Sequence, residues 1–281
     1  MKAAANFFSK NASRIWLALV YLFLYIPLFF LIVFSFNSTR QDGVFTGFSL
    51  RWYQALVEDS RLVEGFFLSL KVALMTGTLS VVLGCFAAFV LVRYRRFSGR
   101  TLFYGMVNAP LVMPEVIIGL SLLLLMVAAQ RTLGFPERGF VTIVIGHTLL
   151  GMAYATVVIQ SRLVEMDRSI EEAAMDLGCR PMQVFFLVTL PNIAPALVSS
   201  WLLSFTLSFD DVVISEFLSG PGVTTLPQVI FSYARRGVNP SIYAAATILI
   251  AVVSLGIIGY SVFMMRRQKR LDREINAAAA A

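Results

Sequence analysis

The chain has 281 residues, of which 58% are hydrophobic and 14% are charged, and its formal net charge is +7. Soluble domains carry about a quarter of charged residues, so this composition excludes an ordinary soluble protein and indicates a chain that crosses a membrane. Two cysteines are too few for a disulfide framework.

Six apolar segments alternate with polar connections along the chain. Four of them are free of charge over a length that can cross a hydrocarbon core, which needs about 20 residues of helix. The third and fifth segments are less uniform, because prolines or acidic residues interrupt them. We therefore predict an all-α integral membrane protein, a single domain over 1–281, with six transmembrane helices near 15–36, 72–92, 102–129, 140–160, 191–214 and 242–265.

Charged residues are distributed unevenly over the connections. Basic residues precede the first span, crowd the connection 93–100 and follow the last span at 266–273, whereas the connection 40–64 mixes both signs. Because cytoplasmic loops carry the excess of Lys and Arg, both termini are predicted to be cytoplasmic. This pattern favours a basic membrane rim over a nucleic-acid surface. The first apolar run is also too long for a cleaved signal, so we expect an uncleaved anchor.

The third apolar segment contains two prolines and an acid. Pro110 and Pro114 each remove a helical N–H and leave a carbonyl one turn earlier without its partner. Glu115 follows directly. One interpretation is a carboxyl group kept neutral or paired with an arginine; the other is a site on a cation pathway, which broken helices and membrane acids often mark.

The fourth span contains the single histidine, His147. With no cysteine or paired acid near it in sequence, no metal site can be assembled around it. We expect this histidine to be packed, or hydrogen-bonded between helices.

The connection 165–191 has the pattern of two short helices. Ser169 and Glu172 have the spacing of a capping box. Gly178 suits the left-handed residue that ends a helix, and Pro181 suits the first position of the next one. The charge distribution places this pair of helices in the cytoplasm.

The fifth span carries a polar stripe at helical spacing, which includes Ser204 and Ser208. Asp210 and Asp211 end the stripe, and Glu216 follows within two turns. Acids in a membrane segment are costly unless they face water, a partner or a cation. A hydrophilic path along this helix and structural pairing of the aspartates both remain open.

A fixed pattern of residues runs through the connection 165–191. Glu172-Ala173-Ala174 is followed by Gly178, by Val188 where isoleucine is usual, and by Leu190-Pro191. This pattern resembles the cytoplasmic E-A-A loop of permease subunits in binding-protein-dependent ABC importers. Further segments across the chain resemble the polyamine branch of that family, among them SFNSTR, NAPLVMPEVIIGLSLLLL, SFTLSFDDVVISEFLSGPG and GVNPSIYAAATILI.

The resemblance implies a type I ABC importer permease fold with a cytoplasmic coupling-helix loop, in a bacterial inner membrane. It implies a polyamine substrate, putrescine in particular, and transport by alternating access. The implied partners are a second, non-identical permease, two cytoplasmic ATPase subunits and a periplasmic polyamine-binding protein. This chain has no Gly-rich phosphate loop, so ATP and Mg would bind the ATPase, and no cofactor or catalytic residue is expected here.

The resemblance also assigns roles to residues. The residues implied to couple the permease to the ATPase are Glu171, Glu172, Ala173, Ala174, Gly178, Leu190 and Pro191. Carboxylates suit a substrate that carries ammonium groups. The candidate substrate path therefore consists of Glu115, Ser204, Ser208, Asp210, Asp211 and Glu216.

Two other classes are the alternatives. A secondary transporter or channel for a small cationic solute usually repeats its helix breaks in both halves, whereas the proline break occurs once here. A membrane-embedded enzyme would need an acid–base pair or a nucleophile, for which the two aspartates are the sole candidates. An ATPase that co-purifies with the chain would distinguish the importer from both.

Overall fold

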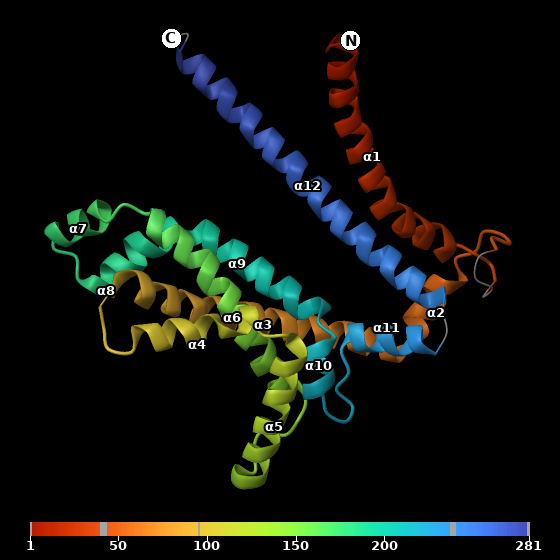
Figure 1. The fold of residues 1–281 in the computed structure, drawn as a ribbon, viewed down its shortest axis with the longest axis horizontal. Coiled ribbons are helices and arrows are strands. Elements are labelled where there is room, and N and C mark those ends of the chain that lie inside the picture. Colours follow the sequence, from red (N-terminus) through yellow and green to blue (C-terminus); the bar gives the residue numbers. More distant parts are fainter. Residues whose placement is uncertain (1, 40–43, 95, 237–239, 280–281) are drawn as a thin grey trace. The chain divides into compact units, whose positions relative to one another are not determined.

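The computed structural model describes residues 2–39, 44–94, 96–236 and 240–279 (Figure 1). Within these ranges every regular element is a helix, apart from an isolated bridge between Asn37 and Phe48. The predicted all-α class is thereby confirmed for the described part of the chain. Arg95 and the side chains of residues 267–281, which belong to the predicted basic rim, lie outside the description. The chain divides into two compact units, Met1–Ser60 with Tyr233–Ala281, and Arg61–Ser232.

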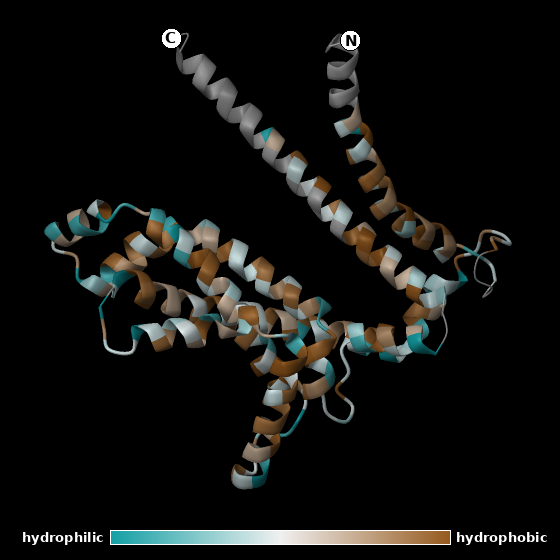
Figure 2. Cartoon of the chain, in the orientation of Figure 1, coloured by the Kyte–Doolittle hydropathy of each residue, from teal (hydrophilic) through white to brown (hydrophobic). Residues whose placement is uncertain are grey.

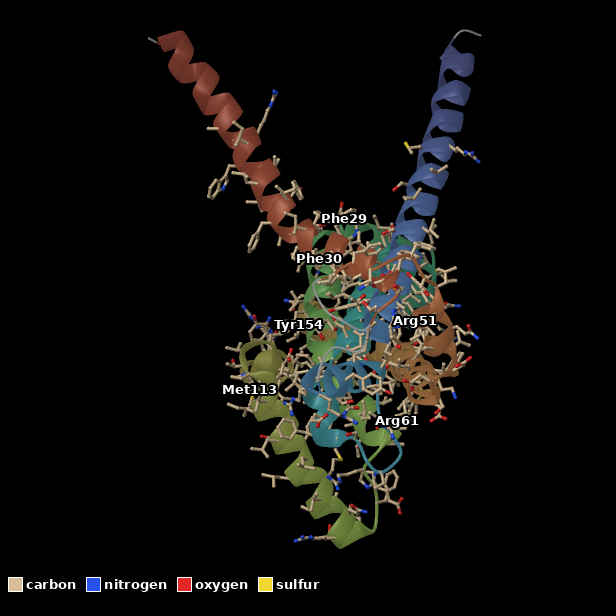
Figure 3. All side chains as sticks on the ribbon, turned by 90° about the vertical axis from the view of Figure 1, so that its right-hand side faces the viewer. Phe29, Phe30, Arg51, Arg61, Met113 and Tyr154 are labelled. Carbon is tan, nitrogen blue, oxygen red and sulfur yellow. The ribbon has the colours of Figure 1, made fainter. Side chains whose placement is uncertain are left out.

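The first unit contains α1 (Lys2–Ser35), α2 (Arg51–Glu58) and α12 (Pro240–Ala279), and α12 contacts both other helices. The end of α1 and the segment after it are hydrogen-bonded to α2. Trp52 Nε1 donates to the carbonyl oxygen of Asn37 at 2.7 Å, and the hydroxyls of Ser35 and Tyr53 are 2.7 Å apart. Large apolar side chains of α1 are exposed, Phe29 and Phe30 among them (Figure 3), as is typical of a helix that faces lipid.

The second unit is built around α6 (Phe140–Glu165), the most buried of the long apolar helices. One apolar cluster joins α6 to α3 (Ser60–Arg93), α5 (Glu115–Leu133) and α10 (Val213–Leu218). A second cluster joins α6 to α3 and α9 (Leu190–Asp210). The unit also contains α4 (Arg100–Val112), α7 (Ser169–Asp176), α8 (Pro181–Val184) and most of α11 (Leu226–Arg235).

Small residues let α3, α6 and α9 approach closely. A Cβ added to Gly84 of α3 would lie 2.8 Å from the Cβ of Ala155 on α6. A Cβ added to Gly151 of α6 would overlap the hydroxyl of Ser80 and lie 3.3 Å from the Cβ of Ser204. In a membrane the association of helices depends on such close packing, because apolar surface gains little by leaving lipid.

Five helices within the described residues are long and apolar enough to cross a membrane: Ala12–Ser35, Ser60–Arg93, Glu115–Leu133, Phe140–Glu165 and Pro181–Asp210. They include the predicted first, second, fourth and fifth spans, and Figure 2 shows the apolar character of α5. The predicted span at 242–265 lies in α12, where the apolar segment, Pro240–Gly256, is shorter. The count of six spans therefore stays a prediction.

The predicted third span, 102–129, is two helices rather than one broken span. α4 ends at Val112, and α5 begins at Glu115. Pro114 between them is extended, with ψ 135°, because it cannot donate the N–H that a continuous helix would need. The change of direction lies at Met113 (Figure 3). As a result Glu115 sits in the first turn of a helix, where the dipole favours a negative charge.

Candidate functional site

The loop after α6 forms two short helices, as predicted. Gly178 has a φ of +91°, the left-handed conformation that favours glycine. The N–H of Gly178 donates to the carbonyl of Met175 at 2.9 Å, and that of Cys179 to the carbonyl of Ala174 at 3.1 Å. These bonds close the end of α7. Pro181 is the first residue of α8, which confirms the second predicted helix start.

The predicted capping box at Ser169 is wrong. Ser169 is itself helical, and no side chain caps the helix at the preceding residue, Arg168. Asp167 supplies the acceptor instead, because its Oδ1 accepts the backbone N–H of Ser169 at 3.0 Å. This hydrogen bond stabilises the carboxylate and lowers the pKa of Asp167 below its ordinary value. The local pattern identified the helix but placed its start one residue too late.

The chain continues from α8 through a π-helical segment, Phe185–Thr189, into α9. Phe185 packs edge-to-face against Phe89 of α3, with ring centroids 5.1 Å apart. Met182 and Phe186 of the same apolar pattern are largely exposed. One face of this second helix is therefore packed on α3, and another is open.

Two adjacent glutamates of α7 occupy different environments. Glu171 Oε1 lies 2.7 Å from Arg93 Nη2 at the end of α3 and accepts the hydroxyl of Thr189 at 2.6 Å. Glu172 is exposed. Sequence reasoning grouped the two glutamates and missed both Arg93 and Thr189, because 78 residues separate Arg93 from its partner.

The other predicted coupling residues differ in exposure. Ala173, Gly178 and Pro191 are exposed, while Ala174 and Leu190 are half-buried. These residues, with Glu172, lie on the loop or at the start of α9. The apolar side chains of α7 and its C-terminal turn are also open, with Ile170 46% and Leu177 87% exposed. The loop thus offers an apolar surface with acids beside it.

His147 of α6 joins a buried polar cluster with α9 and α10. Its Nδ1 lies 2.7 Å from Ser208 Oγ, and its Nε2 lies 3.0 Å from Asp211 Oδ2 and 3.1 Å from Ser215 Oγ. The carboxylate of Asp211 also accepts the backbone N–H groups of Ile214 at 3.3 Å and Ser215 at 2.8 Å. The expectation of an interhelically bonded histidine is confirmed.

The polar stripe of the fifth span faces α6. Ser204 is buried, and its hydroxyl donates to the carbonyl of Gly151 at 3.2 Å. Ser208 is buried against His147. Two of the predicted path residues are therefore enclosed between helices of this chain. The periodicity located the stripe correctly, but it could not indicate which neighbour the stripe would meet.

The predicted path acids separate into bonded and open groups. Asp211 is bonded as described, and its side chain is 8% exposed. Asp210, Glu115 and Glu216 are exposed, and Glu216 Oε2 accepts Gln228 Nε2 at 3.0 Å. Among the described residues, no three His, Cys, Asp or Glu side chains are grouped so that they could hold a metal ion. The open carboxylates can attract cations in solution.

Within the described residues, helices long and apolar enough to cross a membrane, with a short helical loop between two of them, define an integral membrane protein. Residues 80–271 match the model of the binding-protein-dependent transport system inner membrane component family. The chain belongs to this family of ABC importer permeases. It is therefore a transport component of the inner membrane and not an enzyme, and the ATPase is a separate subunit.

Relatives match nearly the whole chain. The chain is 51% identical to the Escherichia coli K12 putrescine transport system permease protein PotI, over 93% of this chain and 94% of the relative. It is 37% identical to the Haemophilus influenzae spermidine/putrescine transport system permease protein PotC, over 94% and 98% of the two chains. A chain of a bacterial alginate ABC importer has the same fold, with a TM-score of 0.70, 15% identity and coverage of 94% and 98%.

Proposed function

We propose that this chain is the permease subunit of an ATP-driven polyamine importer and carries putrescine across the inner membrane. The observation that carries this proposal is the 51% identity, over 93% of the chain, to a permease named for putrescine transport. The 37% identity to a spermidine/putrescine permease supports the same class of substrate. The chain would act as one permease domain over 1–281, with six spans and both termini in the cytoplasm.

The proposed complex contains a second, non-identical permease, two ATPase subunits that bind ATP and Mg, and a periplasmic polyamine-binding protein. A structural relative of this chain occurs in an alginate importer in complex with an alginate-bound periplasmic protein, which supports a binding-protein partner. The exposed apolar side chains of α7, such as Ile170 and Leu177, suit a helix that docks in a groove of another subunit. In this proposal the loop 165–191 is the docking element for the ATPase.

Exposed carboxylates are the proposed contacts for substrate. An alkyl diamine that leaves water needs a charge partner for each ammonium group. Asp210 and Glu115 are exposed and can supply such partners, and Glu216 is exposed as well, although its Oε2 already accepts a hydrogen bond from Gln228. Asp211, Ser204 and Ser208 are bonded within the chain, and we assign them to the support of the path rather than to substrate contact.

Transport would proceed by alternating access. Closure of the ATPase dimer would move the loop 165–191, and the two permeases would then open their shared cavity to the periplasm and, after hydrolysis, to the cytoplasm. Glu172 and Gly178 are among the exposed residues of this loop. Glu172→Ala is expected to reduce substrate-stimulated ATP hydrolysis while the permease still inserts. Normal stimulation and uptake in this variant would contradict the docking role.

The decisive experiment is uptake by the whole complex in liposomes with labelled putrescine. We expect competition by unlabelled putrescine at lower concentration than by spermidine, and none by amino acids. Asp210→Asn removes one charge-assisted contact, worth about 1.5–3 kcal/mol, so KM should rise roughly tenfold or more. Glu137→Gln, at an exposed loop position, is the matched control. Uptake without the ATPase would contradict ATP-driven transport. An unchanged KM for Asp210→Asn would contradict a contact between Asp210 and the substrate.

A further inference from the structure

The end of α3 and the start of α7 are joined by a largely buried ion pair. Arg93 Nη2 and Glu171 Oε1 are 2.7 Å apart, and their side chains are 11% and 12% exposed. The same oxygen accepts the hydroxyl of Thr189, at 2.6 Å, from the π-helical segment. One carboxylate oxygen therefore links three elements of the second unit.

A second bond fastens the same end of the loop. Arg168 Nη2 donates to the carbonyl of Val92 at 3.1 Å, one residue before Arg93. Val92 belongs to the apolar cluster that joins α3, α6 and α9. Both bonds therefore attach the start of α7 to the end of α3, next to this apolar cluster.

The rest of α7 makes little contact with the core of this unit. None of its residues is buried, and its apolar side chains Ile170 and Met175 are 46% and 45% exposed. The part of α7 that follows Glu171 is therefore exposed and available to contact another protein. Movement of α7 can reach the permease body through two routes, the covalent chain and the bonds at Arg93 and Arg168.

The signs of the charges fit both helix ends. Arg93 is in the last turn of α3, where the helix dipole favours a cation, and Glu171 is in the first turn of α7, where it favours an anion. A buried pair that loses one member leaves the other charge without compensation. The contact should therefore weaken strongly when either residue is neutralised.

We propose that the Arg93–Glu171 pair is the link that transmits movement of the coupling loop to α3, so that both are positioning residues for transport. This inference rests on the proposed coupling of the loop to an ATPase. It gives the two adjacent glutamates separate roles: Glu172 faces the partner, and Glu171 ties the loop to the permease. Loss of the pair should uncouple hydrolysis from transport without releasing the ATPase.

The test compares four forms of the complete complex in liposomes: wild type, Glu171→Gln, the exchanged pair Arg93→Glu with Glu171→Arg, and Glu137→Gln. Glu137 is an exposed acid outside the loop 165–191 and serves as the matched control. We expect Glu171→Gln to lower the amount of substrate imported per ATP hydrolysed at least fivefold, with the ATPase still bound. The exchanged pair should recover most of that ratio, and Glu137→Gln should keep it.

A second readout does not depend on the substrate. Spin labels at Tyr94 and Asp176, introduced as cysteines with Cys179 replaced by serine, report the distance between the end of α3 and α7. Glu171→Gln should broaden this distance distribution, and the exchanged pair should narrow it again. An unchanged distribution and ratio in Glu171→Gln would overturn the link, and so would dissociation of the ATPase. A wild-type complex that imports no polyamine yet shows the expected distances would refute the proposed substrate alone.

Discussion

Replacement of Asp211 by alanine should destabilise the protein far more than the same change at its neighbour Asp210. Asp211 Oδ2 accepts His147 at 3.0 Å, and the carboxylate accepts two backbone N–H groups in the first turn of α10. Loss of a capping side chain costs about 0.5–2 kcal/mol, and loss of a hydrogen bond to a charged group about 1.5–3 kcal/mol. The expected cost for Asp211→Ala is therefore roughly 2–5 kcal/mol.

The assay is thermal unfolding of the purified chain in detergent. For chains of this size one kcal/mol shifts Tm by about 2–4 °C, so Asp211→Ala should lower Tm by roughly 10 °C. Asp210→Ala should change the free energy of unfolding by about 0.5 kcal/mol or less, because Asp210 is exposed. His147→Ala provides a second test, since it should reproduce part of the Asp211→Ala loss. Equal shifts for both aspartates, or no shift for Asp211→Ala, would refute the structural role.

Three further predictions concern the loop and the helix packing. Gly178→Ala should strain the left-handed end of α7 by about 1 kcal/mol and increase proteolysis of the loop, whereas Gly105→Ala, within α4 and in open space, should be neutral or slightly stabilising. The lowered pKa of Asp167 stabilises the start of α7 above the ordinary carboxyl pKa of 3.8, and this stability is lost as the pH falls through the lower folded value. Hydrogen-exchange protection of the first turn of α7 should therefore fall in acid, and Asp167→Asn should remove that dependence. Gly84→Ala should cost about 1–3 kcal/mol, measured as a lower Tm, because the added carbon would meet Ala155 and the backbone of Thr156.

Much of the loop 165–191 could be predicted because its signals are local. Gly178 and Pro181 restrict their own backbone, so they mark a helix end and a helix start wherever the chain lies. The capping residue is not determined by the local sequence. Asp167 and Ser169 are both suitable acceptors, and the local pattern does not decide which of them is outside the helix.

In the third span the prolines were correctly read as helix-disturbing, but the sequence did not predict that the span would be two separate helices. Pro110 and Pro114 both predicted a disturbance, yet Pro110 lies inside α4 and only Pro114 separates two helices. A proline inside a membrane helix is tolerated when neighbours take up the freed carbonyl. The outcome therefore depends on what packs nearby.

By itself the sequence determined the membrane class, four of the six predicted apolar spans, and the two short helices of the loop, because chain length, hydrophobicity and backbone restriction act within a few residues. The tertiary structure alone decided the partners of the charged groups. His147 meets Asp211 across 64 residues of chain, and Arg93 meets Glu171 across 78. Periodicity assigns a side chain to a face of its helix, but the helix that covers this face is selected by packing of the whole unit. For that reason the two aspartates and the two glutamates, adjacent in sequence, have different environments in the folded protein.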